Sequence, residues 1–369
     1  MTQVEIGIGK SGRRAYGFDD VTILPSRRTR DPEDISLAWE IDAYRFELPL
    51  LASAMDGVTS PRTAVEIGRL GGLGVLNLEG LWTRYDDPEP LLAEIAEADD
   101  ASVTKRMQEI YAEPVKEHLI GRRIAEMKAA GVTTAASLTP QRTKKFASAV
   151  VDSGVDLFVI QGTVVSAEHV SSRSEPLNLK EFIHTLDVPV IVGGCATYQA
   201  ALHLMRTGAA GILVGVGSGQ ADTTRQVLGV GAPMATAIAD VAGARRDYLD
   251  ESGGRYVHVI ADGGMRTGGD VAKAIACGAD AVMMGSPLAR ATEAPGRGWH
   301  WGHGSFHAEV PRGTRVRVDE VGTLEQVLLG PAITDDGTTN LFGALRRSMA
   351  LTGYSSIKEF QRVEVVVSA

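Results

Sequence analysis

The sequence predicts a single (β/α)8 barrel, in which eight parallel strands close into a ring and helices cover its outside. Eight short apolar runs of the kind found in buried strands recur along the chain, separated by helical segments. These runs cover residues 48–55, 72–77, 133–138, 156–162, 188–194, 211–217, 256–264 and 281–286. An open doubly wound sheet is the alternative, and it is disfavoured because no Gly-x-Gly-x-x-Gly motif follows the first strand.

The last two predicted strands both end in glycine. One ends in Asp262-Gly263-Gly264 and the next in Gly285-Ser286. Glycines allow backbone N–H groups to approach a phosphate, and the loops after strands 7 and 8 are the usual phosphate site of such barrels. The pattern therefore predicts a phosphate site, although two ordinary tight turns would give the same residues.

Barrel chemistry takes place at the carboxyl ends of the strands, so the residues there are the first candidates for a functional site. That face is expected to present Ser53, Met55, Asp56, Asn77, Gln161, Cys195, the loop 215–224, Asp262 and Ser286.

Composition limits the partners and the compartment. The formal net charge of −9 argues against a nucleic-acid polymer, although a mononucleotide needs only local N–H donors for its phosphate. Two cysteines, Cys195 and Cys277, form no disulfide framework and suit a reducing environment. No charged-then-apolar leader opens the chain and no apolar run is long enough to span a bilayer. We therefore expect a cytoplasmic protein with no membrane partner.

Residues 1–369 are expected to form one domain. The connection between the second and third strands, residues 87–130, shows helical periodicity with many charges, which predicts solvated helices rather than an inserted domain. Residues 323–369 are expected to close the chain with a helix over 341–353 and a short valine strand.

Residues 287–322 are rich in glycine and are expected to form a lid-like loop across the barrel mouth. Three histidines lie in this segment, His300, His303 and His307. Their spacing matches no tetrahedral metal site, so they are expected to be solvent-exposed lid residues.

Taken together, motifs along nearly the whole chain resemble the IMP dehydrogenase/GMP reductase family. The motifs that carry the resemblance are YGFDDVTILPSRR (16–28), LASAMDGVTS (51–60), GGLGVLN (71–77), VGVGSGQADTTR (214–225), IADGGMRTGGDVAKAIACGADAVMMGS (260–286) and EAPG (293–296). FMN-dependent hydroxyacid oxidases share the segment around Asp262 but not the first two motifs. The paired regulatory domains that many IMP dehydrogenases insert after strand 2 are absent, and residues 87–130 take that place.

The resemblance implies that the barrel binds a purine ribonucleotide such as IMP, XMP or GMP, with NAD(P) as cofactor and a homotetramer as the assembly. By motif, Asp262 would accept hydrogen bonds from the ribose hydroxyls, which suits an ionised carboxylate. The residues that would contact the rest of the nucleotide are Ser53, Met55, Gly264, Gly285, Ser286, Gly302, His303, Gly304 and Arg312.

Several positions depart from the family pattern. Asp222 stands where the family's mobile loop carries the cysteine that attacks the purine C2 carbon, and a carboxylate is a poor substitute for a thiolate. Gln220 replaces a phosphate-contacting serine, Arg312 stands at the base-reading Glu or Gln position, and Gln161 replaces the aspartate that binds the nicotinamide ribose. The family's flap with its water-activating Arg-Tyr pair is also missing.

Other catalytic and binding positions are retained. The cofactor would contact Gln161, Gly162 and Thr163, and the residues at the catalytic loop and beside it would be Asp222, Thr224 and Arg317. Gly217, Gly219 and Asp222 match a monovalent-cation site, which backbone carbonyls would make suitable for potassium. Cys195 would be either a packed residue at a strand end, which is favoured, or a relocated nucleophile.

Four functions follow from these observations. The first is an IMP dehydrogenase-related, NAD-dependent oxidoreductase of the IMP-to-XMP type with an altered catalytic loop. The second is a catalytically silent, regulatory purine-nucleotide-binding protein. The third is a GMP reductase-like enzyme, because reductases also lack the Arg-Tyr flap. The fourth is an FMN barrel, which a yellow colour of the purified protein would reveal.

Overall fold

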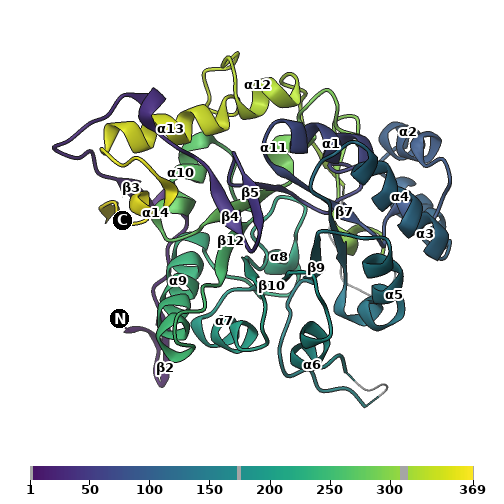
Figure 1. Cartoon of the computed structure of the whole chain (residues 1–369), viewed down its shortest axis with the longest axis horizontal. Helices are drawn as coiled ribbons and strands as arrows, with labels where there is room; N and C mark the ends of the chain where they lie inside the picture. Colours follow the sequence, from purple (N-terminus) through teal and green to yellow (C-terminus); the bar gives the residue numbers. More distant parts are fainter. Residues whose placement is uncertain (1–2, 173–175, 308–314, 369) are drawn as a thin grey trace.

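The computed structural model describes all residues except 1–2, 173–175, 308–314 and 369. Eight parallel strands close into a barrel in the order β10-β11-β12-β13-β6-β7-β8-β9 (Figure 1). The strands are β6 (Leu50–Ala52), β7 (Leu73–Asn77), β8 (Ala135–Leu138), β9 (Leu157–Gln161), β10 (Val190–Cys195), β11 (Gly211–Val214), β12 (His258–Asp262) and β13 (Ala281–Met284). Each lies within a predicted strand or differs from it by one residue, so the predicted (β/α)8 barrel is confirmed and the open sheet is excluded.

Helices surround this ring and connect its strands (Figure 1). They are α1 (Pro61–Arg69), α2 (Glu89–Glu97), α3 (Val103–Tyr111), α4 (Glu117–Ala129), α5 (Pro140–Asp152), α6 (Leu179–His184), α7 (Tyr198–Met205), α8 (Thr224–Val227), α9 (Met234–Glu251), α10 (Gly268–Ala276), α11 (Ser286–Ala289), α12 (Leu324–Leu328), α13 (Leu341–Leu351) and α14 (Ile357–Phe360). No described helix is both long and apolar enough to cross a membrane.

Local sequence explains where helix α1 begins. The Ser60 hydroxyl accepts the N–H of Thr63 at 3.0 Å, and Pro61 occupies the first helical position of α1, where its missing N–H has no cost.

The close packing of α1 against the barrel requires a glycine on strand β7. A Cβ at Gly74 of β7 would lie 2.4 Å from the Cα of Ala64, so α1 lies directly against the barrel wall.

The barrel interior is a packed apolar core that is closed at its amino-terminal end by a hairpin. Strands β4 (Trp39–Ile41) and β5 (Tyr44–Phe46) pair antiparallel, and Trp39, Ile41 and Phe46 join the side chains inside the ring. Trp39 donates its indole N–H to the Leu48 carbonyl at 2.9 Å. The amino-terminal end of the barrel interior is therefore filled by side chains, and a ligand would bind at the opposite end.

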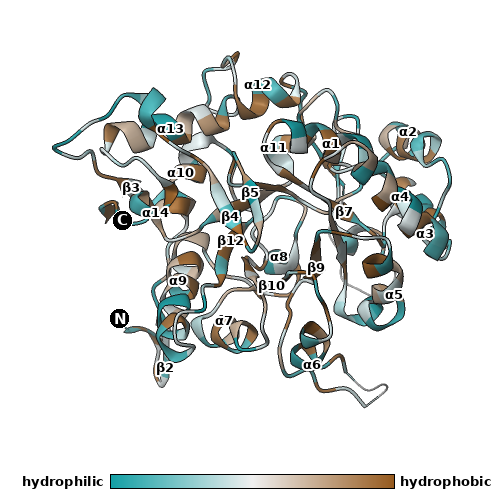
Figure 2. Ribbon diagram, viewed as in Figure 1, coloured by the Kyte–Doolittle hydropathy of each residue, from teal (hydrophilic) through white to brown (hydrophobic). Residues whose placement is uncertain are grey.

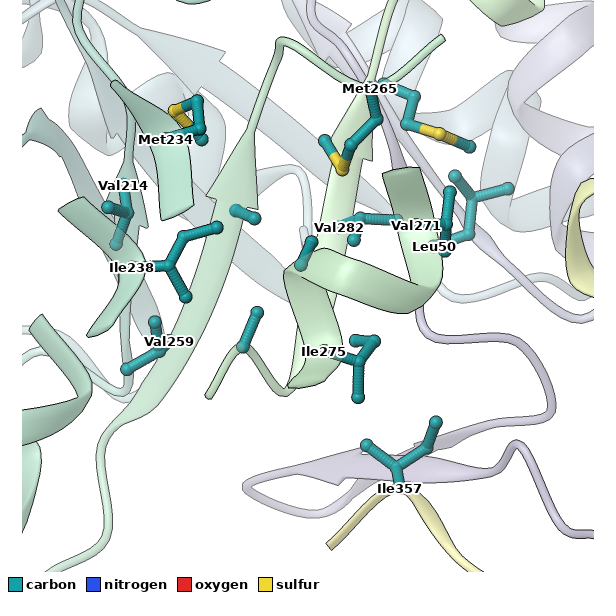
Figure 3. Packing of buried hydrophobic residues seen from close by; sticks show 14 of the residues in the cluster. Leu50, Val214, Met234, Ile238, Val259, Met265, Val271, Ile275, Val282 and Ile357 are labelled. Carbon is teal, nitrogen blue, oxygen red and sulfur yellow. The ribbon is translucent and has the colours of Figure 1, made fainter. Parts of the chain in front are cut away.

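A larger apolar cluster lies between the barrel and its outer helices. Figure 3 shows part of it, where Val259 and Val282 of the strands face Ile238 of α9 and Ile275 of α10. Figure 2 shows the same distribution at low magnification, with hydrophobic strands at the centre and hydrophilic residues on the outer faces of the helices.

The connection between β7 and β8 differs from the prediction. Helices α2, α3 and α4 form here as expected, and they lie together at one side of the barrel (Figure 1). They are not simply solvated, because their inner faces form a second core with Trp301 that includes Leu92, Ile95, Met107, Ile110, Tyr111 and Ile124. The charges that suggested solvation occupy only the outer faces of these amphipathic helices.

Two of the strand pairs outside the barrel involve the ends of the chain. The segments β1 (Gln3–Gly7) and β2 (Lys10–Arg13) form a hairpin next to α9, where Arg13 pairs with Asp240 at 2.5 Å. At the other end of the chain, β16 (Val365–Val367) pairs antiparallel with β3 (Val21–Ile23). The predicted final helix and valine strand are thus observed as α13 and β16.

A buried carboxylate fixes the base of β12 and β13. Asp280 is 1% exposed and accepts hydrogen bonds from Arg245 of α9 at 2.7 Å, from Lys358 of α14 at 2.7 Å and from the Val259 N–H of β12 at 2.8 Å. Burial alone would raise the pKa of Asp280, but the charges of Arg245 and Lys358 outweigh it and lower the pKa to about 2.

We predict that Asp280→Asn lowers the free energy of unfolding by about 3–5 kcal/mol, because it leaves two cations beside an uncharged buried amide. Since the native pKa lies below the unfolded value, the carboxylate stabilises the wild type above pH 4 and loses this effect as the pH falls towards 2. Urea titrations at pH 7 and pH 3 measure both effects. Asp250→Asn, an exposed change on α9, is the control, and equal midpoints for the two variants would contradict the prediction.

Candidate functional site

A cavity of about 470 Å³ opens at the carboxyl ends of the barrel strands. This is the end at which barrels of this type bind their ligands. The predicted site residues that line it are Ser53, Met55, Gln161, Gly162, Thr163, Gly219, Asp222, Thr224, Asp262, Gly264, Gly285, Ser286, Gly302, His303 and Gly304. The structure therefore brings together segments that lie up to about 250 positions apart in the sequence.

The ends of β12 and β13 form one wall of the cavity. Gly263 and Gly264 have φ angles of 78° and 82°, a left-handed conformation that glycine adopts without strain. The Gly263 N–H donates to the Met283 carbonyl on the neighbouring strand at 3.1 Å. At Gly285 a Cβ would lie 2.9 Å from the sulfur of Met55, so glycine keeps this corner open beside Ser286.

Asp262 is the acidic group at the centre of this wall. Its Oδ2 accepts the Gln161 amide at 2.9 Å, and its backbone carbonyl accepts the Ser218 hydroxyl at 2.6 Å. Burial raises the pKa of Asp262 to about 7; the Gln161 hydrogen bond opposes this shift and the nearby Asp222 charge adds to it. The carboxyl group is therefore balanced between its neutral and ionised forms near neutral pH.

Asp222 organises the loop between β11 and α8. Its Oδ2 accepts the Gly217 N–H at 2.9 Å, and its Oδ1 accepts the Thr224 N–H at 3.0 Å. This local closure is typical of aspartate in turns. Both carboxylate oxygens are thus already engaged by the backbone while the side chain borders the cavity.

The proposed monovalent-cation site is not supported by this arrangement. Gly217 does not line the cavity and its N–H points to the Asp222 carboxylate. Within the described part of the chain, no group of three or more His, Cys, Asp or Glu side chains is arranged to hold a metal ion.

The segment after β13 covers one side of the mouth through Gly302, His303 and Gly304. The expectation that its histidines are solvent-exposed is wrong for His300, which is fully buried and forms a 2.7 Å hydrogen bond with the Ser286 hydroxyl. Burial lowers the pKa of His300 to about 4, so the ring is neutral at physiological pH. His303 and His307 are exposed, as expected.

The sequence profile of the IMP dehydrogenase / GMP reductase domain matches residues 15–369. The chain belongs to the IMP dehydrogenase/GMP reductase family. It is 52% identical to an uncharacterised oxidoreductase of Mycolicibacterium smegmatis over 99% of this chain and 100% of that protein. It is 30% identical to the inosine-5′-monophosphate dehydrogenase of Cryptosporidium parvum, over 95% of this chain and 92% of that protein.

A solved structure agrees with this assignment over the whole barrel. The IMP dehydrogenase/GMP reductase-like protein from Corynebacterium glutamicum superposes with a TM-score of 0.94 at 49% identity, covering 99% of this chain and 98% of that one. The chain is thus an oxidoreductase of the IMP dehydrogenase/GMP reductase family with the single-domain (β/α)8 fold.

Some residues assigned from the family pattern are not in the cavity. Arg317 is exposed, with its guanidinium 5.9 Å from the centre of the Trp299 ring, and it does not line the cavity, so the predicted catalytic role has no structural support. Arg312 lies outside the described residues. β15 (Val316–Arg317) pairs with β14 (Trp299–His300), which places Arg317 opposite Trp299, and this pairing is not visible in a sequence motif.

Other strand-end candidates are buried and do not line the cavity. Cys195 is 1% exposed within the large core cluster, and burial raises the pKa of its thiol to about 12. This agrees with the packing interpretation and removes the basis for a relocated nucleophile. Asp56 and Asn77 are likewise buried, with 2% and 4% exposure.

Sequence reasoning missed several residues that line the cavity. Thr139, Pro140 and Gln141 follow β8 directly, and the strand-end rule applied to the third strand would have found them. His300 gave no local signal, because its burial depends on contact with Ser286 of α11.

Proposed function

We propose that the cavity binds a 5′-phosphorylated purine ribonucleotide of the IMP, XMP or GMP type. The observation that carries this proposal is the convergence of Asp262 with the glycine ends of β12 and β13 in one cavity. A carboxylate suits the ribose diol, and the left-handed glycines beside it leave room for a phosphate to approach the backbone. The family's named purine-nucleotide enzymes supply the choice of base.

The same cavity continues past Gln161 to Gly162, Thr163 and Thr139, and we propose that this part receives the nicotinamide end of NAD(P). When bound, the cofactor would accept or donate the hydride of the reaction. The chain would hold the purine against it from the Asp262 side. Gln161 already donates to Asp262, so the cofactor ribose would meet an amide here and no carboxylate.

The loop that holds Asp222 lacks the thiol nucleophile of the family pattern. Asp222 occupies the position of the family's nucleophilic cysteine, and its two oxygens are engaged by backbone N–H groups. Neither Cys195 nor Cys277 lines the cavity. An oxidoreductase of this family would therefore act on the purine without a covalent thiol intermediate.

These observations favour a second candidate, a nucleotide-binding protein without turnover that serves a regulatory role. Assays of IMP with NAD(P) and of GMP with NADPH distinguish the two candidates. An oxidoreductase would change the absorbance of NAD(P)H with one of these nucleotides, and a binding protein without turnover would leave it constant with both.

We also propose that the protein is a cytoplasmic homotetramer.

The first test compares IMP with inosine by calorimetric titration. IMP should bind substantially tighter, because only it carries the phosphate that the glycine ends of β12 and β13 would hold. Asp262→Asn should weaken IMP binding by about 2 kcal/mol, roughly 30-fold, through loss of a charge-assisted pair. Asp250→Asn serves as the exposed control, and equal affinities for IMP and inosine in the wild type would refute the proposed site.

The pKa of Asp262 predicts how IMP binding depends on pH. Because the ionised carboxylate is the form that accepts from the ribose diol, and its pKa is about 7, wild-type affinity should rise between pH 6 and pH 8. The IMP phosphate also titrates in this range, so the quantity to measure is the affinity of the wild type relative to Asp262→Asn. This ratio should grow by roughly tenfold from pH 6 to pH 8; a constant ratio would mean that Asp262 does not contact the diol.

The geometry of Asp222 predicts the outcome of a search for covalent intermediates. Intact-mass spectra after incubation with IMP and NAD should show no purine adduct on residues 215–225 of the wild type. Asp222→Cys should form an adduct and a burst of NADH that stalls before hydrolysis, since a thiol is restored without the family's water-activating pair. Asp222→Ser, which loses the same backbone contacts without gaining a thiol, is the matched control. An adduct in the wild type would overturn the prediction.

A further inference from the structure

A chain of buried polar groups runs from the helical connection to the segment that covers the cavity. The Trp301 indole N–H donates to the Tyr111 hydroxyl at 2.8 Å, and the Tyr111 hydroxyl donates to Asp56 Oδ2 at 2.5 Å. The Leu81 N–H donates to the same oxygen at 3.1 Å. Trp301, Tyr111 and Asp56 are 1%, 6% and 2% exposed, so water does not compete for these bonds.

The direction of every bond in this chain is fixed. An indole can only donate, so the Tyr111 hydroxyl accepts from Trp301 and donates its own O–H to Asp56 Oδ2. Burial raises the pKa of Asp56, and the hydrogen bonds from Tyr111 and Leu81 oppose this shift. Burial and the neighbouring carboxylate raise the pKa of Tyr111 well above its usual value, so the hydroxyl keeps its proton. The bonds from Trp301 to Tyr111 and from Tyr111 to Asp56 Oδ2 thus run in one direction, and they connect the three side chains, while Asp56 Oδ1 is buried without a hydrogen-bond partner.

Tyr111 also contacts the far end of the same segment. Its ring stacks on Phe306 with the ring centres 3.6 Å apart and the planes within 2° of parallel. Trp301 and Phe306 flank the four residues 302–305, which include the short 3-10 helix His303–Ser305. Tyr111 of α3 thus contacts both residues that flank the loop 302–305, and residues 302–304 of this loop line the cavity.

The helical connection holds this covering segment at a second point. Arg315 is 5% exposed, stacks on the Trp299 ring with its guanidinium 3.8 Å from the ring centre, and pairs with Asp100 at 3.0 Å. Its guanidinium also donates to carbonyls at the end of α2, those of Ile95 and Ala98. Cations are favoured at a helix carboxyl terminus, so α2 and α3 both anchor the segment to the barrel.

We propose that Tyr111 is a positioning residue for the purine base. It acts by fixing Gly302, His303 and Gly304 at the cavity, while the phosphate end is held by β12 and β13 and does not depend on it. This inference rests on the proposed nucleotide site and adds a role for the β7–β8 connection. In this chain that connection supports the part of the site that meets the base.

The test separates the two ends of the ligand. Calorimetric titrations with IMP and with ribose 5-phosphate are compared for the wild type and Tyr111→Phe, which keeps the ring stack and removes the hydroxyl. IMP affinity should fall about tenfold, as expected for a loosened loop and a buried donor left without its acceptor, while ribose 5-phosphate affinity should not change. Tyr85→Phe is the matched control, because its hydroxyl donates to the Ile110 carbonyl at 2.8 Å in the same connection, outside the chain to Trp301.

A second variant covers the case in which Tyr111→Phe does not fold. Trp301→Phe removes the donor at the other end of the chain and should give the same selective loss for IMP. Unchanged IMP affinity in either folded variant, or an equal loss for both ligands, would overturn the positioning role. Failure of the wild type to bind either ligand would instead refute the proposed nucleotide site, so the two failures are distinguishable.

Discussion

The carboxylate of Asp280 is the interaction on which the geometry of the site most depends. It lies at the foot of β13, accepts from the backbone of β12 and is neutralised by cations from α9 and α14. Helices that follow different strands and the end of the chain are thereby fixed to the same pair of strands. Because the two strands are held in register below, Asp262 and Gly285 meet at the cavity above.

Residues 302–304, on the other side of the cavity, are held in place by side-chain contacts and not by strand pairing within the barrel. There the backbone is not part of the barrel, and its position comes from side chains of α2 and α3, through Arg315 and Tyr111. A rigid strand pair and a clamped loop thus face each other across one opening. In the proposed nucleotide site, the strand pair would meet the phosphate and ribose, and the loop would meet the base.

The sequence was sufficient for those features that depend on local patterns. Apolar runs located the eight barrel strands, and glycines at strand ends located Asp262, Gly264 and Gly285 at the cavity. Features that depend on distant contacts could not be predicted. Tyr111 lies in a helix whose charges suggested solvation, His300 is buried by a partner 14 positions away, and Arg317 points elsewhere because β15 pairs with β14.

The hydrogen-bonded Asp222 has a consequence for the chemical vulnerability of the protein. An enzyme that relies on a loop thiolate is inactivated by oxidants and by electrophiles that alkylate sulfur. Here the loop carries a carboxylate, Cys195 is sealed in the core with a pKa of about 12, and Cys277 lies away from the cavity. The described lining of the cavity therefore holds no thiol, so oxidation there would reach the thioethers of Met55, Met265 and Met284 instead.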